Sequence, residues 1–295
     1  MNGDSPRRTL LPFAVGLALL VAFSVGLPLI GLAVVDDPGK TERLPDGRVV
    51  SVGKSWPGAF DSCVVDVKRR VLPNCYREKV SRDSVIKEPV SSISALALSI
   101  VGLVILLVTG LERAAGTEPP NFRTPYPEWL GFVAIAMGPG SIVFHATLTK
   151  WGGWFDQMSM YLLLSFMASY DLIRVLRRGF YTFLALYAGI LVVAAVAASF
   201  IGLVAFIVTG VCTGILVAVV LYFLLRRVGL ERDKWRFWLA VGLFGASLAP
   251  WLASNPFAGD PTDIPFHAAW HVLSAVFIGA YWLYLRSERS VQPAT

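Results

Sequence analysis

The sequence predicts an all-α polytopic membrane protein, a seven-transmembrane-helix bundle with one additional N-terminal transmembrane helix. First, 55% of its 295 residues are hydrophobic and only 16% are charged, with a mean hydropathy of +0.62, whereas about a quarter of a typical soluble protein is charged. Second, eight apolar stretches are each long enough to cross a hydrocarbon core of about 30 Å as a helix. Third, Arg and Lys gather in the joints between these stretches, as they do in multi-pass membrane proteins.

The first apolar stretch, residues 11–35, follows Arg7 and Arg8. Its length, and the lack of a small-residue cleavage site after Val35, favour an uncleaved transmembrane helix over a signal peptide. Seven further spans are predicted at about 89–110, 127–148, 154–176, 179–199, 202–226, 235–254 and 265–286. The chain is therefore predicted to comprise an N-terminal helix (1–35), a polar loop (36–87), a seven-helix membrane domain (88–286) and a short tail (287–295).

The basic residues predict how the chain is oriented. They recur after alternate spans, which brings them to one side of the membrane if all eight stretches cross it: Arg7, Arg8, Arg174, Arg177, Arg178, Arg226, Arg227, Arg232, Lys234, Arg236, Arg286 and Arg289. Positive charge is typical of cytoplasmic joints, so both termini are predicted to be cytoplasmic and the loop 36–87 extracytoplasmic. This distribution accounts for the net charge of +6, and nucleic-acid binding is not predicted.

The polar loop contains two of the three cysteines, Cys63 and Cys75, while Cys212 lies within an apolar span. The loop pair can form one disulfide if the loop faces an oxidising compartment. The orientation predicted from the basic residues places the loop on that side.

Polar and ionisable side chains gather at the predicted outer ends of three spans. Ser141 and His145 end the third span, Asp156 begins the fourth, and His267 and His271 begin the eighth, and the chain has no other histidine. Ser141 and His145 are four residues apart, as are the last two histidines, so each pair shares a helix face. Such groups are costly within a membrane and by default carry a function. Three imidazoles with one open position are the ligand set of a catalytic zinc site.

Each of these residues also has a purely structural interpretation. His145 and Ser141 can be hydrogen-bonding contacts between helices, and Asp156 can cap the helix that follows it. Two histidines four residues apart also occur in haem ligation. The metal site is favoured because every histidine falls at one predicted depth beside an acid.

The motifs around these residues resemble those of a known family. Ser141-x3-His145 is followed by Asp156 eleven residues later, and residues 266–271 read FHAAWH. The patterns GS-x2-FH-x-TL and FHA-x-WH are similar to those of the alkaline ceramidases, which belong to a membrane-hydrolase superfamily that includes the adiponectin and progestin receptors. The resemblance covers roughly residues 88–286, the seven-span run.

The resemblance implies a zinc-dependent hydrolase that cleaves the amide bond of ceramide or a related N-acyl membrane lipid. His145, His267 and His271 are then expected to hold Zn²⁺. Asp156 is expected to act as general base and then general acid, and Ser141 to lie beside the metal and donate a hydrogen bond to the developing oxyanion. The products are a fatty acid and a sphingoid-type amine.

Two further stretches bear on this resemblance. The run from Glu88 to Ser94, EPVSSIS, looks like the start of the family's first core helix, with Ser91 in place of the usual Asn. In some ceramidases an acidic cluster leading to that Glu binds Ca²⁺, and Glu78, Asp83 and Glu88 are the candidates here, although their spacing from Cys75 departs from the family pattern. An Asp expected late in the seventh span is replaced by the sequence WLASN, residues 251–255.

The substrate pocket is expected to have apolar walls, with Trp270, Trp154 and Tyr161 near the metal. Trp151 and Trp154 are equally well explained as an interfacial aromatic belt. Three other functions stay open: a hydrolase of another membrane lipid, a receptor-like member of the same superfamily, and a membrane protein that binds haem through two histidines.

Overall fold

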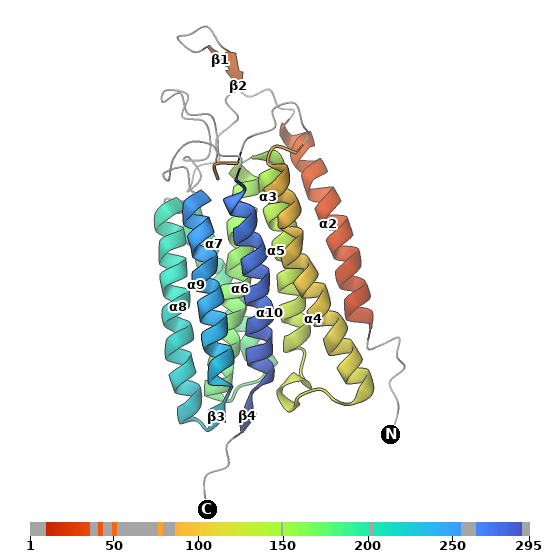
Figure 1. Ribbon diagram of the computed structural model, residues 1–295, viewed down its shortest axis with the longest axis vertical. Coiled ribbons are helices and arrows are strands. Elements are labelled where there is room, and N and C mark those ends of the chain that lie inside the picture. The colour runs from red at the N-terminus through yellow and green to blue at the C-terminus, as the bar shows by residue number, and fades with distance from the viewer. Residues whose placement is uncertain are drawn as a thin grey trace, which may run out of the picture.

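The chain forms a bundle of long helices that stand side by side (Figure 1). The computed structural model describes residues 10–35, 41–43, 49–51, 76–78, 86–148, 150–200, 203–254 and 264–290. Within these residues, seven helical spans from Pro89 onward are long and apolar enough to cross a membrane. The predicted all-α polytopic membrane fold is therefore confirmed.

The helices lie close to their predicted positions. They are α2 (Leu11–Val35), α3 (Pro89–Ser94), α4 (Leu96–Ala115), α5 (Tyr126–Thr147), α6 (Lys150–Leu176), α7 (Phe180–Phe200), α8 (Leu203–Arg227), α9 (Lys234–Ser254) and α10 (Phe266–Arg286). A 3₁₀ turn covers Pro120–Phe122, and two short antiparallel pairs join β1 (Thr41–Arg43) to β2 (Val49–Ser51) and β3 (Leu230–Glu231) to β4 (Arg289–Ser290). Helix α2 packs against α4 and α5. The start of α2 and the end of α10 lie at one end of the bundle, and α3 lies at the other (Figure 1).

The first core span begins where predicted and ends a few residues later than the predicted position near residue 110. It is divided at Ala95 into α3 and α4 and continues to Ala115. The serines of α3 explain the break, because Ser92 donates its hydroxyl to the Glu88 carbonyl and Ser94 donates to the Ser91 carbonyl. Such side-chain bonds compete with the helical backbone pattern.

Close contact between α4 and α5 fixes the position of the histidine-bearing half of α5. A Cβ atom at Gly102 would lie 2.5 Å from the Gly131 carbonyl oxygen, and one at Gly138 would lie 2.0 Å from Ser99 Oγ. The two backbones can therefore approach closely, as small residues allow in membrane helices. Ser99 adds a hydrogen bond from its hydroxyl to the Ile135 carbonyl, at 2.8 Å.

Buried ion pairs hold together the end of the bundle at which α2 begins. Arg232, between α8 and α9, donates to Asp171 on α6 (2.6 Å) and to Glu288 after α10 (2.7 Å). Arg174, at the end of α6, also donates to Glu288, at 2.9 Å. The joints predicted to share one side of the membrane therefore meet at one end of the molecule, and these two arginines have a structural role there as well.

Loss of Arg232 is expected to destabilise the bundle strongly. Burial opposes its charge, but the carboxylates of Asp171 and Glu288 hold the pKa of Arg232 well above its ordinary value. Arg232→Ala would leave two buried carboxylates without this cation, which typically costs about 3–5 kcal/mol. We expect a marked fall in the thermal unfolding midpoint of the detergent-purified protein. The control is Arg227→Ala at the exposed end of α8, expected to change stability by no more than about 0.5 kcal/mol; equal midpoints for both variants would contradict the role of Arg232.

Candidate metal centre

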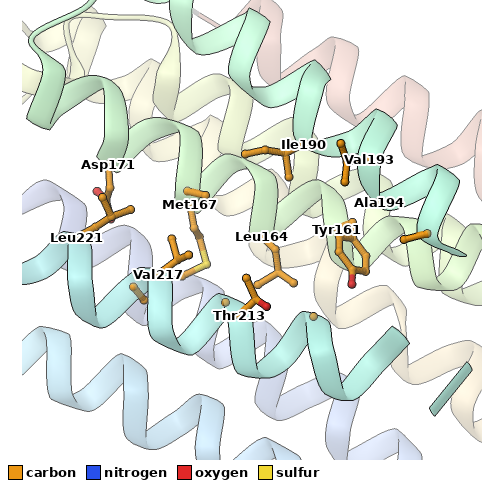
Figure 2. A pocket seen from close by; sticks show the side chains of 15 residues that line it. Tyr161, Leu164, Met167, Asp171, Ile190, Val193, Ala194, Thr213, Val217 and Leu221 are labelled. Atoms are coloured by element: carbon orange, nitrogen blue, oxygen red, sulfur yellow. The ribbon is translucent and has the colours of Figure 1, made fainter. Parts of the chain in front are cut away.

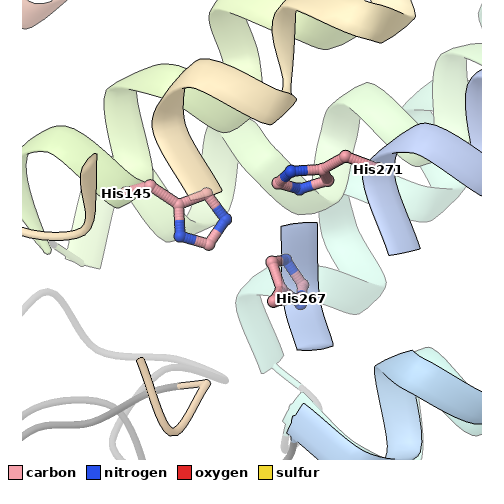
Figure 3. A group of neighbouring side chains, drawn as sticks. All are labelled: His145, His267 and His271. Atoms are coloured by element: carbon pink, nitrogen blue, oxygen red, sulfur yellow. The ribbon is translucent and has the colours of Figure 1, made fainter. Parts of the chain in front are cut away.

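Three buried imidazoles from two helices converge at the end of the bundle that carries α3. His145 comes from α5, and His267 and His271 come from successive turns of α10 (Figure 3). One ring nitrogen from each lies within 4.8 Å of the others, and at most 2% of each residue is exposed. The four-residue spacing puts the two α10 rings on one face, opposite the single ring of α5.

The Glu88 carboxylate is hydrogen-bonded to the Nδ1 atom of His145. Its Oε2 atom accepts a hydrogen bond from His145 Nδ1 at 2.6 Å, and neither side chain is exposed. Burial raises the pKa of Glu88, while the hydrogen bond to His145 opposes that shift. A carboxylate in this position fixes the ring orientation and makes the opposite nitrogen a better metal donor.

The two imidazoles of α10 are oriented by serine hydroxyls. Ser94 Oγ lies 2.8 Å from His271 Nδ1, and Ser254 Oγ lies 3.3 Å from His267 Nδ1. Each serine donates its own proton to a backbone carbonyl, Ser94 to Ser91 and Ser254 to Trp251. The serine oxygens are therefore free to accept the Nδ1 protons, which leaves the Nε2 lone pairs pointing toward the centre.

The Nε2 atoms fit a metal ion as their missing partner. Those of His145 and His267 are buried and have no hydrogen-bond partner among the described residues, and that of His271 meets only the Ser141 hydroxyl at 3.1 Å. Unpaired buried polar atoms are rare and call for an explanation. Zinc–nitrogen bonds of about 2.1 Å put the nitrogen atoms of tetrahedral ligands about 3.4 Å apart. The ring nitrogens lie within 4.8 Å of one another, so each nitrogen–nitrogen distance needs to shorten by at most about 1.4 Å to reach that spacing.

Asp156 and Ser141 border the same space as the imidazoles. Both line a small cavity together with His267 and His271, and its volume of ≈ 20 Å³ is enough for about one water or one ion. Both are buried, and the Ser141 side chain is hydrogen-bonded to the Asp156 carboxyl. The five polar residues singled out in the sequence therefore lie together around one point.

Tyr76 covers this centre and was not expected from the sequence. Its ring stacks on His267 with centroids 3.6 Å apart, and it lines the small cavity. The next two residues fix its position. Arg77 donates to the Ala253 carbonyl at 2.8 Å, and Glu78 accepts from the backbone N–H groups of Val90 and Ser91, each at 2.9 Å. The only sequence signal was its place directly after Cys75 in the polar loop.

The expected pocket residues fall into different surroundings. Trp270 lines the small cavity, whereas Tyr161 lines a separate, larger pocket. Trp154 borders neither of these two and packs with Tyr161 and Trp270 against a buried cluster that contains Tyr76 and Trp251. All three aromatic residues are thus near the centre, and Trp270 is the one in contact with the cavity.

The calcium and disulfide predictions stay predictions. Glu78 receives the N–H groups at the start of α3, and Glu88 pairs with His145, so both carboxylates have protein partners. Asp83, Cys63 and Cys75 lie outside the described residues.

Glu88→Gln is expected to weaken metal binding about 10- to 100-fold, the usual effect of losing such a partner. Glutamine keeps the size of the side chain but removes the charge that supports His145. Competition with a chromogenic zinc chelator measures the affinity. Glu128→Gln, at the far end of α5 where Glu128 pairs with Arg113, is the control. Equal affinities in both variants would exclude a supporting role for Glu88.

In comparisons with known proteins, no family model and no curated protein sequence matches the chain.

Proposed function

We propose that this protein is a zinc-dependent intramembrane hydrolase, related to the alkaline ceramidases, that cleaves the amide bond of ceramide-like N-acyl lipids. One observation carries the proposal: three buried imidazoles with hydrogen-bonded Nδ1 atoms bring one ring nitrogen each within 4.8 Å of the others, and two of them line a small cavity together with a buried carboxyl and a hydroxyl. A coordination site with an acid beside it is the arrangement that metal-assisted hydrolysis requires.

His145, His267 and His271 would hold the zinc, which supplies a Lewis acid that polarises an acyl carbonyl and activates a water. Asp156 would accept a proton from the attacking water and then donate it to the leaving amine nitrogen, as one carboxyl can in successive steps. Ser141 would donate a hydrogen bond to the carbonyl oxygen as negative charge develops there, an interaction worth about 3–4 kcal/mol where measured elsewhere.

Tyr76 and Trp270 would shield the reacting groups. Tyr76 covers His267, and Trp270 lines the cavity wall. A shielded site strengthens the electrostatic interactions within it. The volume of ≈ 20 Å³ at the imidazoles leaves no room for a porphyrin ring, so the arrangement favours a single ion over haem.

We also propose that the metal centre faces the extracytoplasmic side. The basic joints, including Arg174 and Arg232, meet at the opposite end of the bundle from α3. Basic joints are typical of the cytoplasmic side, so both chain termini would be cytoplasmic.

The test is the metal content of the detergent-purified protein together with fatty-acid release from a panel of ceramides before and after chelation. About one zinc per chain with chelator-sensitive release is the expected result. Zinc with release only from other N-acyl or ester-linked lipids would keep the hydrolase and change its substrate. Zinc without any turnover would favour a receptor-like protein, and a folded protein without zinc would overturn the proposal.

A further inference from the structure

A second, larger pocket lies between α6, α7 and α8, and is called here the α6–α8 pocket. It has a volume of ≈ 260 Å³ and fifteen lining residues, of which only Tyr161, Asp171 and Thr213 carry polar side-chain groups. It exists because α7 and α8 both pack along α6 but contact each other little. Its walls suit an apolar ligand.

The pocket runs lengthwise along α6. Figure 2 shows Tyr161 at one end and Asp171 at the other, with Leu164 and Met167 between them. The ten residues from Tyr161 to Asp171 correspond to about 15 Å of helix, or about half of a hydrocarbon core of about 30 Å. An extended aliphatic chain fits this shape better than a compact molecule does.

The end of the pocket at Tyr161 lies next to the metal centre. Met160 lines the small cavity at the imidazoles, and its neighbour Tyr161 lines the α6–α8 pocket, so consecutive residues of α6 border both spaces. Gly210 of α8 makes room for the Tyr161 ring, because a Cβ atom there would lie 2.3 Å from the phenol oxygen. An apolar chain that runs from Asp156 into the α6–α8 pocket would therefore pass Tyr161.

At the Asp171 end of the pocket, the one charged lining residue is already paired and does not offer its charge to a ligand. Asp171 is almost fully buried, and its carboxylate accepts a hydrogen bond from Arg232 at 2.6 Å. A ligand with a charged or strongly polar group at that end would have to compete with this buried pair. The occupant is thus expected to place its polar group at the Tyr161 end and a methyl group at the Asp171 end.

We infer that the α6–α8 pocket binds the acyl chain of the lipid substrate and sets the chain length that the protein accepts. This inference rests on the proposed function, because it assigns the chain to the molecule that is cleaved at the metal centre. Tyr161 lines the pocket at the end nearest to the metal centre, where the carbonyl end of the chain would meet its apolar part.

The first experiment fills the pocket. Ala194 of α7 is 5% exposed and lines the pocket, whereas Ala188, on the same helix, is exposed and does not. Ala194→Phe is expected to lower fatty-acid release from an N-palmitoyl lipid by about tenfold or more relative to an N-hexanoyl lipid, as steric exclusion from a binding pocket does. Ala188→Phe should keep the wild-type ratio. Ala218→Phe fills the same pocket from α8 and should repeat the effect; retained N-hexanoyl turnover shows that each variant is folded.

The second experiment detects the chain without requiring turnover. A ceramide with a diazirine at the end of its acyl chain is added to the chelated wild-type protein and to both α7 variants, and cross-linked residues are identified by mass spectrometry. Labelling near Met167, Val217 and Leu221 that is lost in Ala194→Phe and kept in Ala188→Phe supports the inference. Labelling that is confined to the exposed residues Leu216 and Val220, and equal in all three proteins, would show that the chain contacts α8 only from the surrounding lipid, and would overturn the inference.

The two proposals can fail separately. If the wild-type protein releases fatty acids and Ala194→Phe keeps the wild-type chain-length preference, the inference about the pocket fails and the hydrolase stands. If the zinc-loaded wild-type protein releases no fatty acid from any lipid, the hydrolase fails. Labelling within the pocket that Ala194→Phe blocks would then still support binding of a lipid chain there.

Discussion

Replacing His267 with alanine is expected to reduce the zinc content of the purified protein from about one ion per chain to a trace. Among the described residues, the grouped metal ligands at the centre are three imidazoles, and binding free energies at structural zinc sites are about 10–16 kcal/mol. Losing one ligand should remove about 3–5 kcal/mol, which lowers the affinity on the order of 10³-fold. Elemental analysis measures the metal, and fatty-acid release from ceramide should be lost with it.

The control for this variant is Ser274→Ala. Ser274 lies two turns further along α10 and lines the same small cavity, and its hydroxyl is buried without a hydrogen-bond partner among the described residues. This variant should keep its zinc and unfold at the same temperature as the wild type. One full zinc ion in His267→Ala would contradict the assignment of the ligands, whereas zinc loss in both variants would point to general damage of the site.

Replacing Asp156 with asparagine should separate metal binding from catalysis. Asparagine has nearly the same size but cannot take up a proton at neutral pH, and general acid–base catalysis typically contributes about 10²- to 10⁴-fold to a rate. Asp156 is not one of the three residues that are grouped as metal ligands, so the zinc content should stay near one ion per chain. We therefore expect fatty-acid release to fall by at least about 100-fold with the metal retained.

Ser159→Ala is the matched control for Asp156→Asn. Ser159 lines the same cavity one turn later on α6, and its hydroxyl donates only to the Asp156 backbone carbonyl, at 2.6 Å. Loss of the Ser159 hydroxyl should change the rate of fatty-acid release by no more than about threefold, because a hydrogen bond from a serine to a carbonyl of its own helix does not stabilise that helix. Wild-type turnover in Asp156→Asn would remove the carboxyl from the mechanism.

Local features of the sequence predicted the spans well because crossing a bilayer imposes length and composition directly. The predicted stretch 235–254 and the observed α9, Lys234–Ser254, differ by one residue. The break at Ala95 was missed because periodicity shows apolar content but not whether a serine hydroxyl will bond to the backbone of its own helix. Ser92 and Ser94 decide that point.

The sequence by itself determined the helical spans and which polar residues form the candidate centre. Histidine is rare in this chain, and a spacing of four residues fixes a shared helix face without any tertiary information. Only the tertiary structure decided how the imidazoles are oriented. Glu88 lies 57 residues from His145, and Ser94 lies 177 residues from His271. Tyr76, the buried Arg232 pairs and the α6–α8 pocket depend in the same way on distant segments, because burial and hydrogen bonding are set by which helices become neighbours.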